Sequence, residues 1–407
     1  MAINLPIVDA KLRNPRVPLT ELEQSAFCQV EPLETKPLAE ELNAGVRWQR
    51  LPDSYVNMTP EELTTRIEAN KVQLGSRAVI LGHHYQREDI IQFADFRGDS
   101  LKLSQYAADQ QGSEFIIFCG VHFMAETAAV LGGAHQKVVL PNINAGCSMA
   151  DMAPTDDALD CWHDLMTTLG TGSVIPVTYM NSTAEIKALV GENGGAVCTS
   201  SNADRVVAWA FQQGKRVLFL PDQHLGRNTG AKMGVPLDEM VLWNPFQPLG
   251  GNTAEALERS KMILWKGHCS VHTRFTTDQI ARARQEYPDV QVIVHPECML
   301  ESVQEADYVG STELIVKMVS ESAHGSVWAI GTEINLVSRL AHENPDKTVF
   351  CLDPVDCPCS TMYRIHPAYL LWVTDELLAG RVPNQVSVAP ETAHYAKVAL
   401  DRMLSLS

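Results

Sequence analysis

Short apolar segments that end in polar residues recur along the chain from about residue 75 onward. The clearest ones are rich in Val and Ile and are bounded by Gly, Pro or polar residues. Three of them lead into a polar motif: residues 78–82 into His83-His84-Tyr85, residues 174–177 into Thr178-Tyr179-Met180-Asn181, and residues 292–294 into His295-Pro296-Glu297. Short runs of β-branched residues of this kind predict buried strands of a parallel sheet.

A second and a third apolar segment follow in each stretch, and helical patterns separate them. We predict second strands at 115–119, 196–198 and 307–309, and third strands at 138–141, 217–221 and 327–331. Helices are predicted at 202–213 and 313–322, with Gly214 and Gly325 near their carboxyl ends, where glycine is common. Alternating strands and helices favour parallel α/β units with right-handed crossovers.

A cysteine closes each of these stretches: Cys147, Cys269 and Cys359. The pattern therefore predicts three related three-layer αβα domains with parallel sheets, and residues 226–262, rich in Gly, Pro and Asn, are interpreted as an insertion in the second. Ligands bind beyond the carboxyl ends of strands in such sheets. Three units about a pseudo-threefold axis would therefore direct their polar ends at one central active site. The alternative is a single doubly wound domain with accidental self-similarity.

The predicted domain boundaries follow from this repeat. Residues 1–74 form an N-terminal extension, in which Thr59-Pro60-Glu61-Glu62 has the pattern of a helix start with a capping box. The three α/β domains are predicted at 75–170, 171–270 and 271–350. Residues 351–407 hold the third cysteine loop and C-terminal helices. No chemistry is expected in the extension.

Composition narrows the possible partners. The chain has 407 residues, 45% of them hydrophobic, which is enough for more than one domain. A net charge of −17 without a run of Lys or Arg disfavours nucleic acid and anionic membranes as partners. We see neither a membrane-spanning segment nor a secretory signal, so we expect a cytoplasmic protein. In such a reducing compartment, ten cysteines indicate metal ligation or catalysis, and disulfides are not expected.

The three closing cysteines have the setting of metal ligands. Cys147 and Cys269 follow Ala145-Gly146 and Gly267-His268, where glycine lets the backbone approach a bulky ligand, and Cys359 follows Cys357-Pro358. Thiolates select zinc or iron–sulfur clusters. Structural zinc sites usually draw their ligands from close pairs, so ligands from three distant loops favour a shared cluster. Three thiolates would leave one coordination position open for a substrate.

Other residues near these loops leave alternatives open. Cys357 could be a ligand in place of Cys359, pair oxidatively with it, or have no direct role, which we favour. His272, three residues after Cys269, could complete a zinc set, but a buried histidine behind the ligands is the commoner case. Inert thiols away from strand ends are expected at Cys28, Cys161 and Cys351.

Two kinds of polar residue suit catalysis and anion binding. His295 and Glu297 alternate around Pro296, so an extended chain would direct both to one side as an acid–base pair, although a local salt bridge is the plainer interpretation. Tyr85 could transfer a proton or be an ordinary core-edge tyrosine. Hydroxyls near predicted helix starts could bind anions or simply cap the helices: Ser100, Ser200 and Thr312. Another polar strand end, 221–226, could be a lid or lie behind the site.

These motifs resemble those of quinolinate synthase, the iron–sulfur enzyme of NAD biosynthesis. The resemblance runs from about residue 75 to about residue 380 and includes all three cysteine loops. The other matching motifs are His83-His84-Tyr85, Gly98-Asp99-Ser100-Leu101, Tyr179-Met180-Asn181-Ser182, Cys198-Thr199-Ser200-Ser201-Asn202, His295-Pro296-Glu297 and Gly310-Ser311-Thr312. Some members carry C-x2-C-x2-C at the third loop, where this chain has Cys357-Pro-Cys359, and the pattern Cys359-Ser-Thr-Met362 favours Cys359.

The resemblance implies a reaction and a cofactor. Iminosuccinate and dihydroxyacetone phosphate would condense to quinolinate, phosphate and water. A [4Fe-4S] cluster would be held by Cys147, Cys269 and Cys359, and its open iron would act as a Lewis acid. A functional link to the L-aspartate-oxidising enzyme that supplies iminosuccinate is also implied.

The resemblance also implies site residues. Tyr85, His295 and Glu297 would be catalytic. The substrate-binding set would be His83, Ser100, Tyr179, Met180, Asn181, Ser200, His295, Pro296, Glu297 and Thr312. Competing interpretations are an iron–sulfur hydro-lyase acting on another small carboxylate, a non-enzymatic iron–sulfur sensor and a zinc enzyme.

Overall fold

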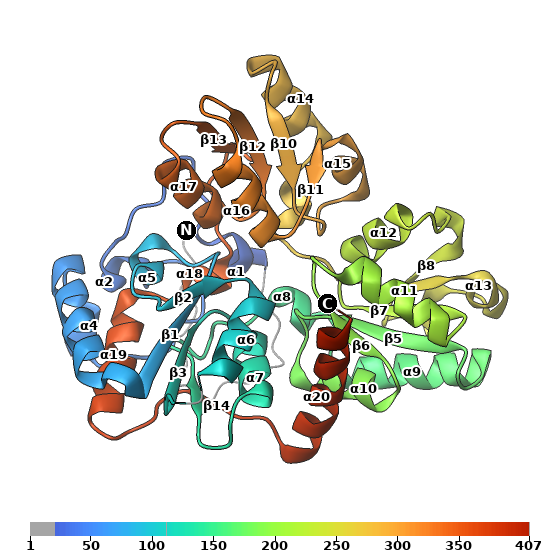
Figure 1. Ribbon diagram of the computed structural model, residues 1–407, viewed down its shortest axis with the longest axis horizontal. Helices are drawn as coiled ribbons and strands as arrows, with labels where there is room; N and C mark the ends of the chain where they lie inside the picture. The colour runs from blue at the N-terminus through green and yellow to red at the C-terminus, as the bar shows by residue number, and fades with distance from the viewer. Residues whose placement is uncertain (1–20, 111, 407) are drawn as a thin grey trace. The chain divides into compact units, whose positions relative to one another are not determined.

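The computed structural model describes residues 21–110 and 112–406 (Figure 1). The chain divides into two compact units. The first comprises Met1–Cys147, Glu333–Pro345 and Asp353–Ser387, and the second Ser148–Thr332, Asp346–Leu352 and Val388–Ser407.

Three sheets carry the fold. The first unit holds a sheet in the order β14 (Gln385–Val386), β4 (Lys137–Val139), β3 (Phe115–Cys119), β1 (Ala78–His83) and β2 (Phe96–Gly98). The second unit holds β6 (Ala196–Cys198), β5 (Val174–Tyr179), β7 (Arg216–Leu220), β9 (Met262–Trp265) and β8 (Met240–Trp243). It also holds β11 (Tyr308–Val309), β10 (Gln291–Val294), β12 (Val327–Gly331) and β13 (Thr348–Cys351). Neighbouring strands are parallel except β14 and β4.

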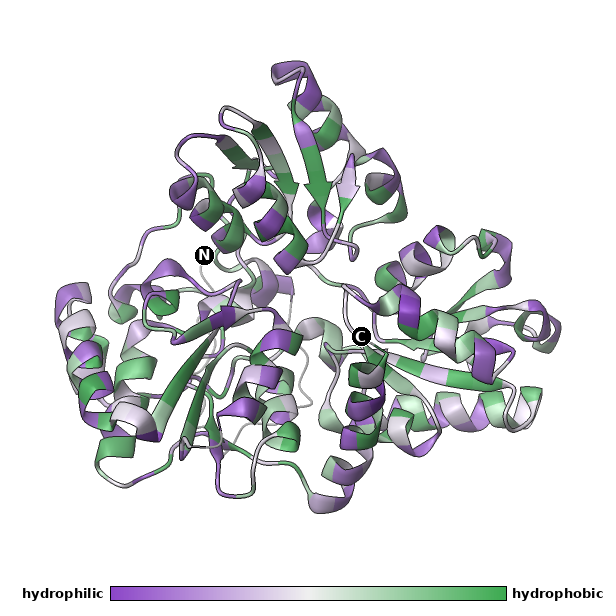
Figure 2. Cartoon of the chain, in the orientation of Figure 1, coloured by the Kyte–Doolittle hydropathy of each residue, from purple (hydrophilic) through white to green (hydrophobic). Residues whose placement is uncertain are grey.

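The helices follow the predicted alternation with the strands. In the first unit they are α1 (Glu21–Ser25), α2 (Leu38–Glu41), α3 (Asp53–Val56), α4 (Pro60–Leu74), α5 (Glu88–Ile91), α6 (Ser100–Asp109), α7 (His122–Leu131), α17 (Ile334–Glu343), α18 (Ser360–Tyr363) and α19 (Pro367–Leu378). In the second they are α8 (Ser148–Asp151), α9 (Thr155–Leu169), α10 (Ala184–Glu192), α11 (Ala203–Gln213), α12 (Gln223–Lys232), α13 (Ala254–Arg259), α14 (Thr277–Glu286), α15 (Leu300–Glu305), α16 (Thr312–Glu321) and α20 (Pro390–Ser405). The strands are largely apolar, whereas the helices alternate apolar and polar residues (Figure 2).

The same strand order recurs in all three sheets. If the strands are counted in chain order within each repeat, with β8 set aside, every sheet has the order second, first, third, fourth. The three sheets are β2-β1-β3-β4, β6-β5-β7-β9 and β11-β10-β12-β13. This confirms the prediction of three related α/β units with parallel sheets. Residues 226–262 contain β8, an extra edge strand beside β9 without a counterpart in the third sheet.

The repeat has four strands, and the prediction of three was wrong. β2, β9 and β13 were not predicted as strands, and 115–119 is the third strand of the first sheet rather than its second. Phe96-Arg-Gly98 has little β-branched character, and Met262-Ile-Leu-Trp265 fits a helix equally well. Cys147, Cys269 and Cys359 each follow a fourth strand, namely β4, β9 and β13. Cys351 ends β13, so placing it away from strand ends was also wrong.

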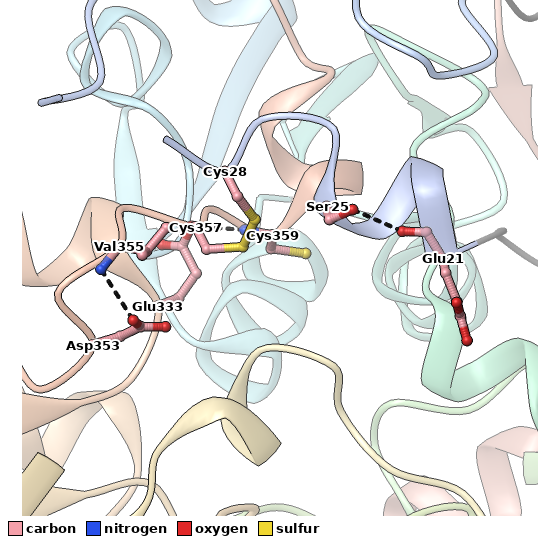
Figure 3. The surroundings of a disulfide bond; sticks show 8 residues. All are labelled: Glu21, Ser25, Cys28, Glu333, Asp353, Val355, Cys357 and Cys359. Carbon is pink, nitrogen blue, oxygen red and sulfur yellow. Dashed lines mark hydrogen bonds between the residues drawn. A yellow bond between two sulfur atoms is a disulfide. The ribbon is translucent and has the colours of Figure 1, made fainter. Parts of the chain in front are cut away.

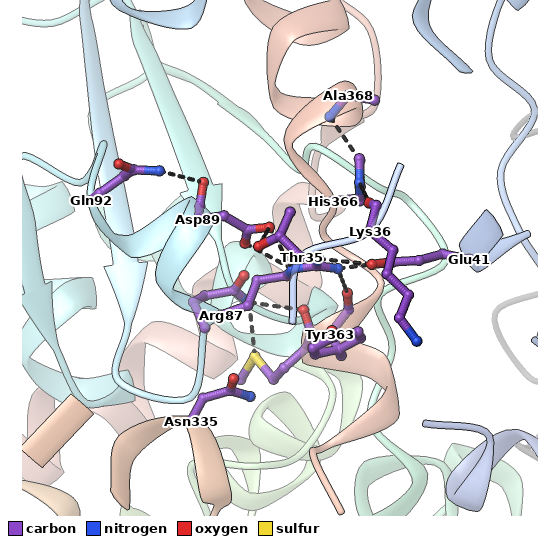
Figure 4. A network of polar contacts seen from close by, with 12 residues as sticks. Thr35, Lys36, Glu41, Arg87, Asp89, Gln92, Asn335, Tyr363, His366 and Ala368 are labelled. Atoms are coloured by element: carbon purple, nitrogen blue, oxygen red, sulfur yellow. Dashed lines mark hydrogen bonds and ion pairs between the residues drawn. The ribbon is translucent and has the colours of Figure 1, made fainter. Parts of the chain in front are cut away.

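The segment before β1 packs into the first unit. Thr59 caps α4 in the predicted capping box with Glu62. Arg87 holds α2 through a bidentate pair with Glu41, at 2.8 and 2.9 Å, and both side chains are almost fully buried (Figure 4). The Arg87 guanidinium also lies 4.1 Å from the centre of the Tyr363 ring, on α18 directly after the third cysteine loop.

A disulfide joins this segment to the third cysteine loop. Cys28 is bonded to Cys357 (Figure 3). Next to this bond, Gln29 and Asp356 exchange two backbone hydrogen bonds of 2.9 Å. The expectations that disulfides are absent and that Cys28 is an inert thiol were therefore wrong. The two cysteines are 329 residues apart, so their pairing depends on tertiary folding that their spacing does not indicate. Among the described residues, no helix combines the length and the apolar character that a membrane crossing requires.

Arg87→Met should lower the free energy of unfolding by about 3–5 kcal/mol, because it leaves the Glu41 carboxylate buried without its partner. Thermal unfolding measured by calorimetry tests this. Arg77→Met, at the exposed pair with Glu114, is the matched control and should leave the melting temperature nearly unchanged. Equal shifts in the two variants would contradict a structural role for the buried pair.

Mass spectrometry of peptides from unreduced protein should find Cys28 linked to Cys357, with Cys359 free. The linked peptide should disappear after reduction. A Cys357–Cys359 link, or full alkylation of Cys28 without reductant, would contradict the observed pairing.

Candidate functional site

The carboxylate of Glu297 is the centre of a buried polar cluster in the second unit. Its Oε2 lies 3.0 Å from Nδ1 of His272, and it also accepts a hydrogen bond from the Tyr179 hydroxyl. Nδ1 of His295 is 3.8 Å from Oε1 of Glu297. All of these residues are at most 5% exposed. The structure therefore brings together three of the predicted site residues, Tyr179, His295 and Glu297.

His295 and Glu297 face each other because the chain turns. Cys298 N donates to His295 O at 3.0 Å, and Glu297 N lies 3.3 Å from Nδ1 of His295. The predicted common side is correct, but the extended conformation given as its reason was wrong. Asn228 on α12 holds this turn, since its Nδ2 donates to the carbonyls of Pro296 and Cys298, both at 2.8 Å. No sequence motif indicated this role of Asn228.

Burial and charge set the protonation of the pair. Burial by itself would raise the pKa of Glu297, but His272, His295 and the Tyr179 hydrogen bond outweigh it and lower the pKa to about 2. Burial lowers the pKa of His295 to about 3, with a further contribution from His272. At neutral pH the site therefore holds a carboxylate beside a neutral imidazole, which together can accept and donate a proton.

His272 contacts both members of the pair. Its ring stacks on His295 with centroids 4.3 Å apart, and its Nε2 lies 3.2 Å from the hydroxyl oxygen of Thr332. These contacts favour the interpretation as a buried histidine behind the ligands. The donor atoms of Cys269, His272 and Glu297 also lie within 4.8 Å of one another, so this group could bind a metal ion.

The other predicted residues of the second unit stand at strand and helix ends. Met180 and Asn181 follow β5, where Met180 N donates to Cys198 O and the buried Lys187 ammonium donates to Ser182 O. Ser200 comes two residues before Asn202, which stands at the N-cap position of α11 without a side-chain capping bond, and Thr312 is the first residue of α16. Both hydroxyls are thus near helix starts, as predicted.

The first unit holds His83, Tyr85 and Ser100. Tyr85 N donates to Nδ1 of His83 at 3.1 Å, and the two rings are 4.9 Å apart at 73°. Because β1 and β10 hold the same place in their sheets, this His-x-Tyr turn corresponds to the His-x-Glu turn of His295 and Glu297. Ser100 begins α6 after its cap, Asp99. Arg339, which the sequence did not single out, donates to the carbonyl of His84 at 2.7 Å.

Cys147 and Cys359 also belong to the first unit, and two hydrogen bonds join their surroundings. Asn142 Nδ2 donates to Arg364 O at 3.1 Å, and Arg364 Nη1 donates to Asn144 O at 3.3 Å. Cys357 forms the disulfide with Cys28. Of the two cysteines in the third loop, Cys357 and Cys359, only Cys359 therefore has a thiol outside a disulfide (Figure 3).

The thiols fit a soft-metal cofactor in chemistry and exposure. Cys147, Cys269 and Cys359 lie outside any disulfide and are partly exposed, whereas Cys119, Cys161, Cys198 and Cys298 are buried. Cys351 is also partly exposed, and its Sγ faces the carbonyl of Thr332 at 4.0 Å. Burial raises the pKa of the Cys359 thiol. Because Cys351 is partly exposed like Cys147, Cys269 and Cys359, it is the place of these three after the fourth strand of each repeat that distinguishes them.

Known proteins are similar in sequence over most of the chain. The family model described as Quinolinate synthetase A protein matches residues 65–405. The quinolinate synthase of Corynebacterium glutamicum is 58% identical over 360 residues, covering 88% of this chain and 91% of that protein. Those of Acidobacterium capsulatum and Geobacillus thermodenitrificans are each 52% identical, covering 87% and 88% of this chain and 95% and 97% of theirs. The chain belongs to the quinolinate synthase family.

Proposed function

We propose that this protein condenses iminosuccinate with dihydroxyacetone phosphate to quinolinate, using a [4Fe-4S] cluster on Cys147, Cys269 and Cys359. The family match supports the reaction. The observation that carries the cofactor assignment is that each of these partly exposed thiols, none of them in a disulfide, follows the fourth strand of one repeat. Thiolates are the ligands that such clusters prefer.

When bound, the cluster would supply a Lewis acid at an iron without a protein ligand. The protein side of the chemistry rests on proton transfers, because forming the pyridine ring requires loss of phosphate, imine formation and dehydration. Glu297 is ionised at neutral pH, and His272 and Tyr179 fix its orientation. Its low pKa makes it a weak base, so its fixed position, rather than its basicity, is what suits it to accept a substrate proton. His295 is neutral beside it and can pass the proton on. A positioned general base typically contributes roughly 10²–10⁴-fold.

We assign keto–aldehyde isomerisation of the triose to the turn after β1. The Tyr85 amide occupies Nδ1 of His83, so the Nε2 of that ring can donate to a substrate oxygen. The Tyr85 hydroxyl beside it can shuttle a proton. We keep both as proposed site residues.

Substrate anions need local donors in so acidic a chain. We propose that Ser100 and Thr312, at the first positions of α6 and α16, bind carboxylate or phosphate oxygens with the free amides there. Met180, Asn181, Ser200 and Pro296 complete the proposed set. A cytoplasmic location and a supply of iminosuccinate from an L-aspartate-oxidising enzyme complete the proposal.

Cys359→Ser should abolish cluster assembly, and Cys357→Ser should keep it although it breaks the disulfide with Cys28. Iron and sulfide content and the visible absorption of anaerobically reconstituted protein test this. Cluster loss only in Cys357→Ser would reverse the ligand assignment. A colourless wild-type protein with stoichiometric zinc would instead support a zinc site at Cys269, His272 and Glu297.

Glu297→Gln should retain the cluster and lose about 10²-fold or more in turnover, because the amide keeps the shape but cannot take a proton. Anaerobic quinolinate formation measures this. The matched control is Glu239→Gln, which removes an outer charge pair with Lys261 and should leave turnover unchanged. Near-normal turnover of Glu297→Gln would remove Glu297 from catalysis.

A further inference from the structure

In two repeats, the helix after the third strand is capped by a fully buried carboxylate. Asp222 follows β7 and caps α12, with its Oδ1 accepting from Leu225 N at 2.6 Å. Glu333 follows β12 and caps α17, with its Oε2 accepting from Asn335 N at 2.8 Å. Each side chain is 0% exposed. Exposed serine or threonine serves as well for a plain helix cap, so full burial of an acid calls for a further partner.

The further partner in both repeats is the backbone amide of a cysteine. Cys359 N donates to Oε1 of Glu333 at 3.0 Å (Figure 3). In the second repeat the Cys269 amide faces the Asp222 carboxylate, and Asp222 pairs with Gly267 as an isolated parallel bridge. The start of α12 and the Cys269 loop are in direct contact, because Gln223 N donates to Gly267 O at 2.9 Å. A Cβ on Gly267 would come within 2.3 Å of Pro221 O, which only a glycine avoids.

The first repeat makes the equivalent junction with backbone alone. Val121 caps α7 after β3 and has no polar side chain. The next amide, His122 N, donates at 2.8 Å to Ala145 O, two residues before Cys147. Gln223 N donates to the carbonyl two residues before Cys269 in the same way. Contact between the start of this helix and the cysteine loop is thus a property of the repeat, and Asp222 and Glu333 extend it to the cysteine itself.

We propose that Asp222 and Glu333 are positioning residues that fix the ligand loops of Cys269 and Cys359 by accepting the amide hydrogen of each cysteine. The proposal rests on the proposed function, in which these thiols hold the cluster. Without the carboxylate the amide would lose its acceptor, so the loop would open more readily and hold its thiol less firmly. Outer groups that orient metal ligands have this effect on metal retention.

The two acids differ in what can replace them. Oδ2 of Asp222 has no hydrogen-bond partner among the described residues, so asparagine can keep the accepting oxygen. Both oxygens of Glu333 accept, Oε1 from Cys359 N and Asn335 Nδ2, and Oε2 from Asn335 N. In Glu333→Gln, the side-chain NH2 group would therefore face one of the N–H donors that now bind Glu333. Asp222→Asn should behave like the wild type, whereas Glu333→Gln should not.

Hydrogen exchange of the full chain without cluster tests the contacts directly. Asp222→Ala should speed exchange of the Cys269 amide about tenfold, and Glu333→Ala that of the Cys359 amide, as expected for loss of one hydrogen bond. Thr59→Ala removes the cap of a helix far along the chain from any cysteine loop and should leave both amides unchanged. Unchanged exchange in both acid-to-alanine variants would overturn the proposal.

Iron retention after anaerobic reconstitution provides the second readout. Release of iron to a chelator should be about tenfold faster or more in Asp222→Ala and Glu333→Ala than in the wild type and Asp222→Asn. If an alanine variant does not fold, Asp222→Asn and Glu333→Gln carry the comparison, and equal release by both would overturn the proposal. A wild-type chain that takes up no iron would refute the proposed cofactor, while the exchange result would still decide the role of the two acids.

Discussion

The polar core of the second unit depends on one buried carboxylate, which needs hydrogen-bond donors because it is excluded from water. Glu297 is stable in its charged form only because His272 and Tyr179 donate to it. Glu297 and its two donors come from three separate segments of the chain, and Thr332 fixes the far side of the His272 ring. The charge and its donors are therefore oriented before any substrate arrives, which is the condition under which electrostatic stabilisation of a reaction is strongest.

The sequence predicted most of this framework, because the signals involved are local. Runs such as Val174–Val177 are short, β-branched and bounded by breakers, so they identify central strands wherever the sheet lies. β2 and β9 were missed because an arginine, a glycine or unbranched side chains occupy strands whose pairing is decided by their neighbours. The polar ends of strands likewise predicted Tyr179, His295 and Glu297, since the carboxyl ends of parallel strands collect functional residues.

What the sequence could not predict depends on contacts between distant segments. The capping carboxylates Asp222 and Glu333 look like ordinary helix starts until the cysteine loops are seen beside them. Asn228 carries no motif, and its role appears only when its amide reaches two carbonyls far along the chain. The bond between Cys28 and Cys357 is the extreme case, because the expectation of a reducing compartment predicted that no disulfide would form.

The buried pair of Arg87 and Glu41 has a consequence for how this protein can change during evolution. The two partners are not equivalent, because Arg87 also pairs with Asp89 at 2.8 Å, whereas Arg87 is the buried cation that faces Glu41. An apolar residue at position 87 would leave the Glu41 carboxylate buried and uncompensated, while an apolar residue at position 41 would leave Arg87 with Asp89. The order of substitutions is therefore constrained: position 41 can change first, and position 87 can follow only after it.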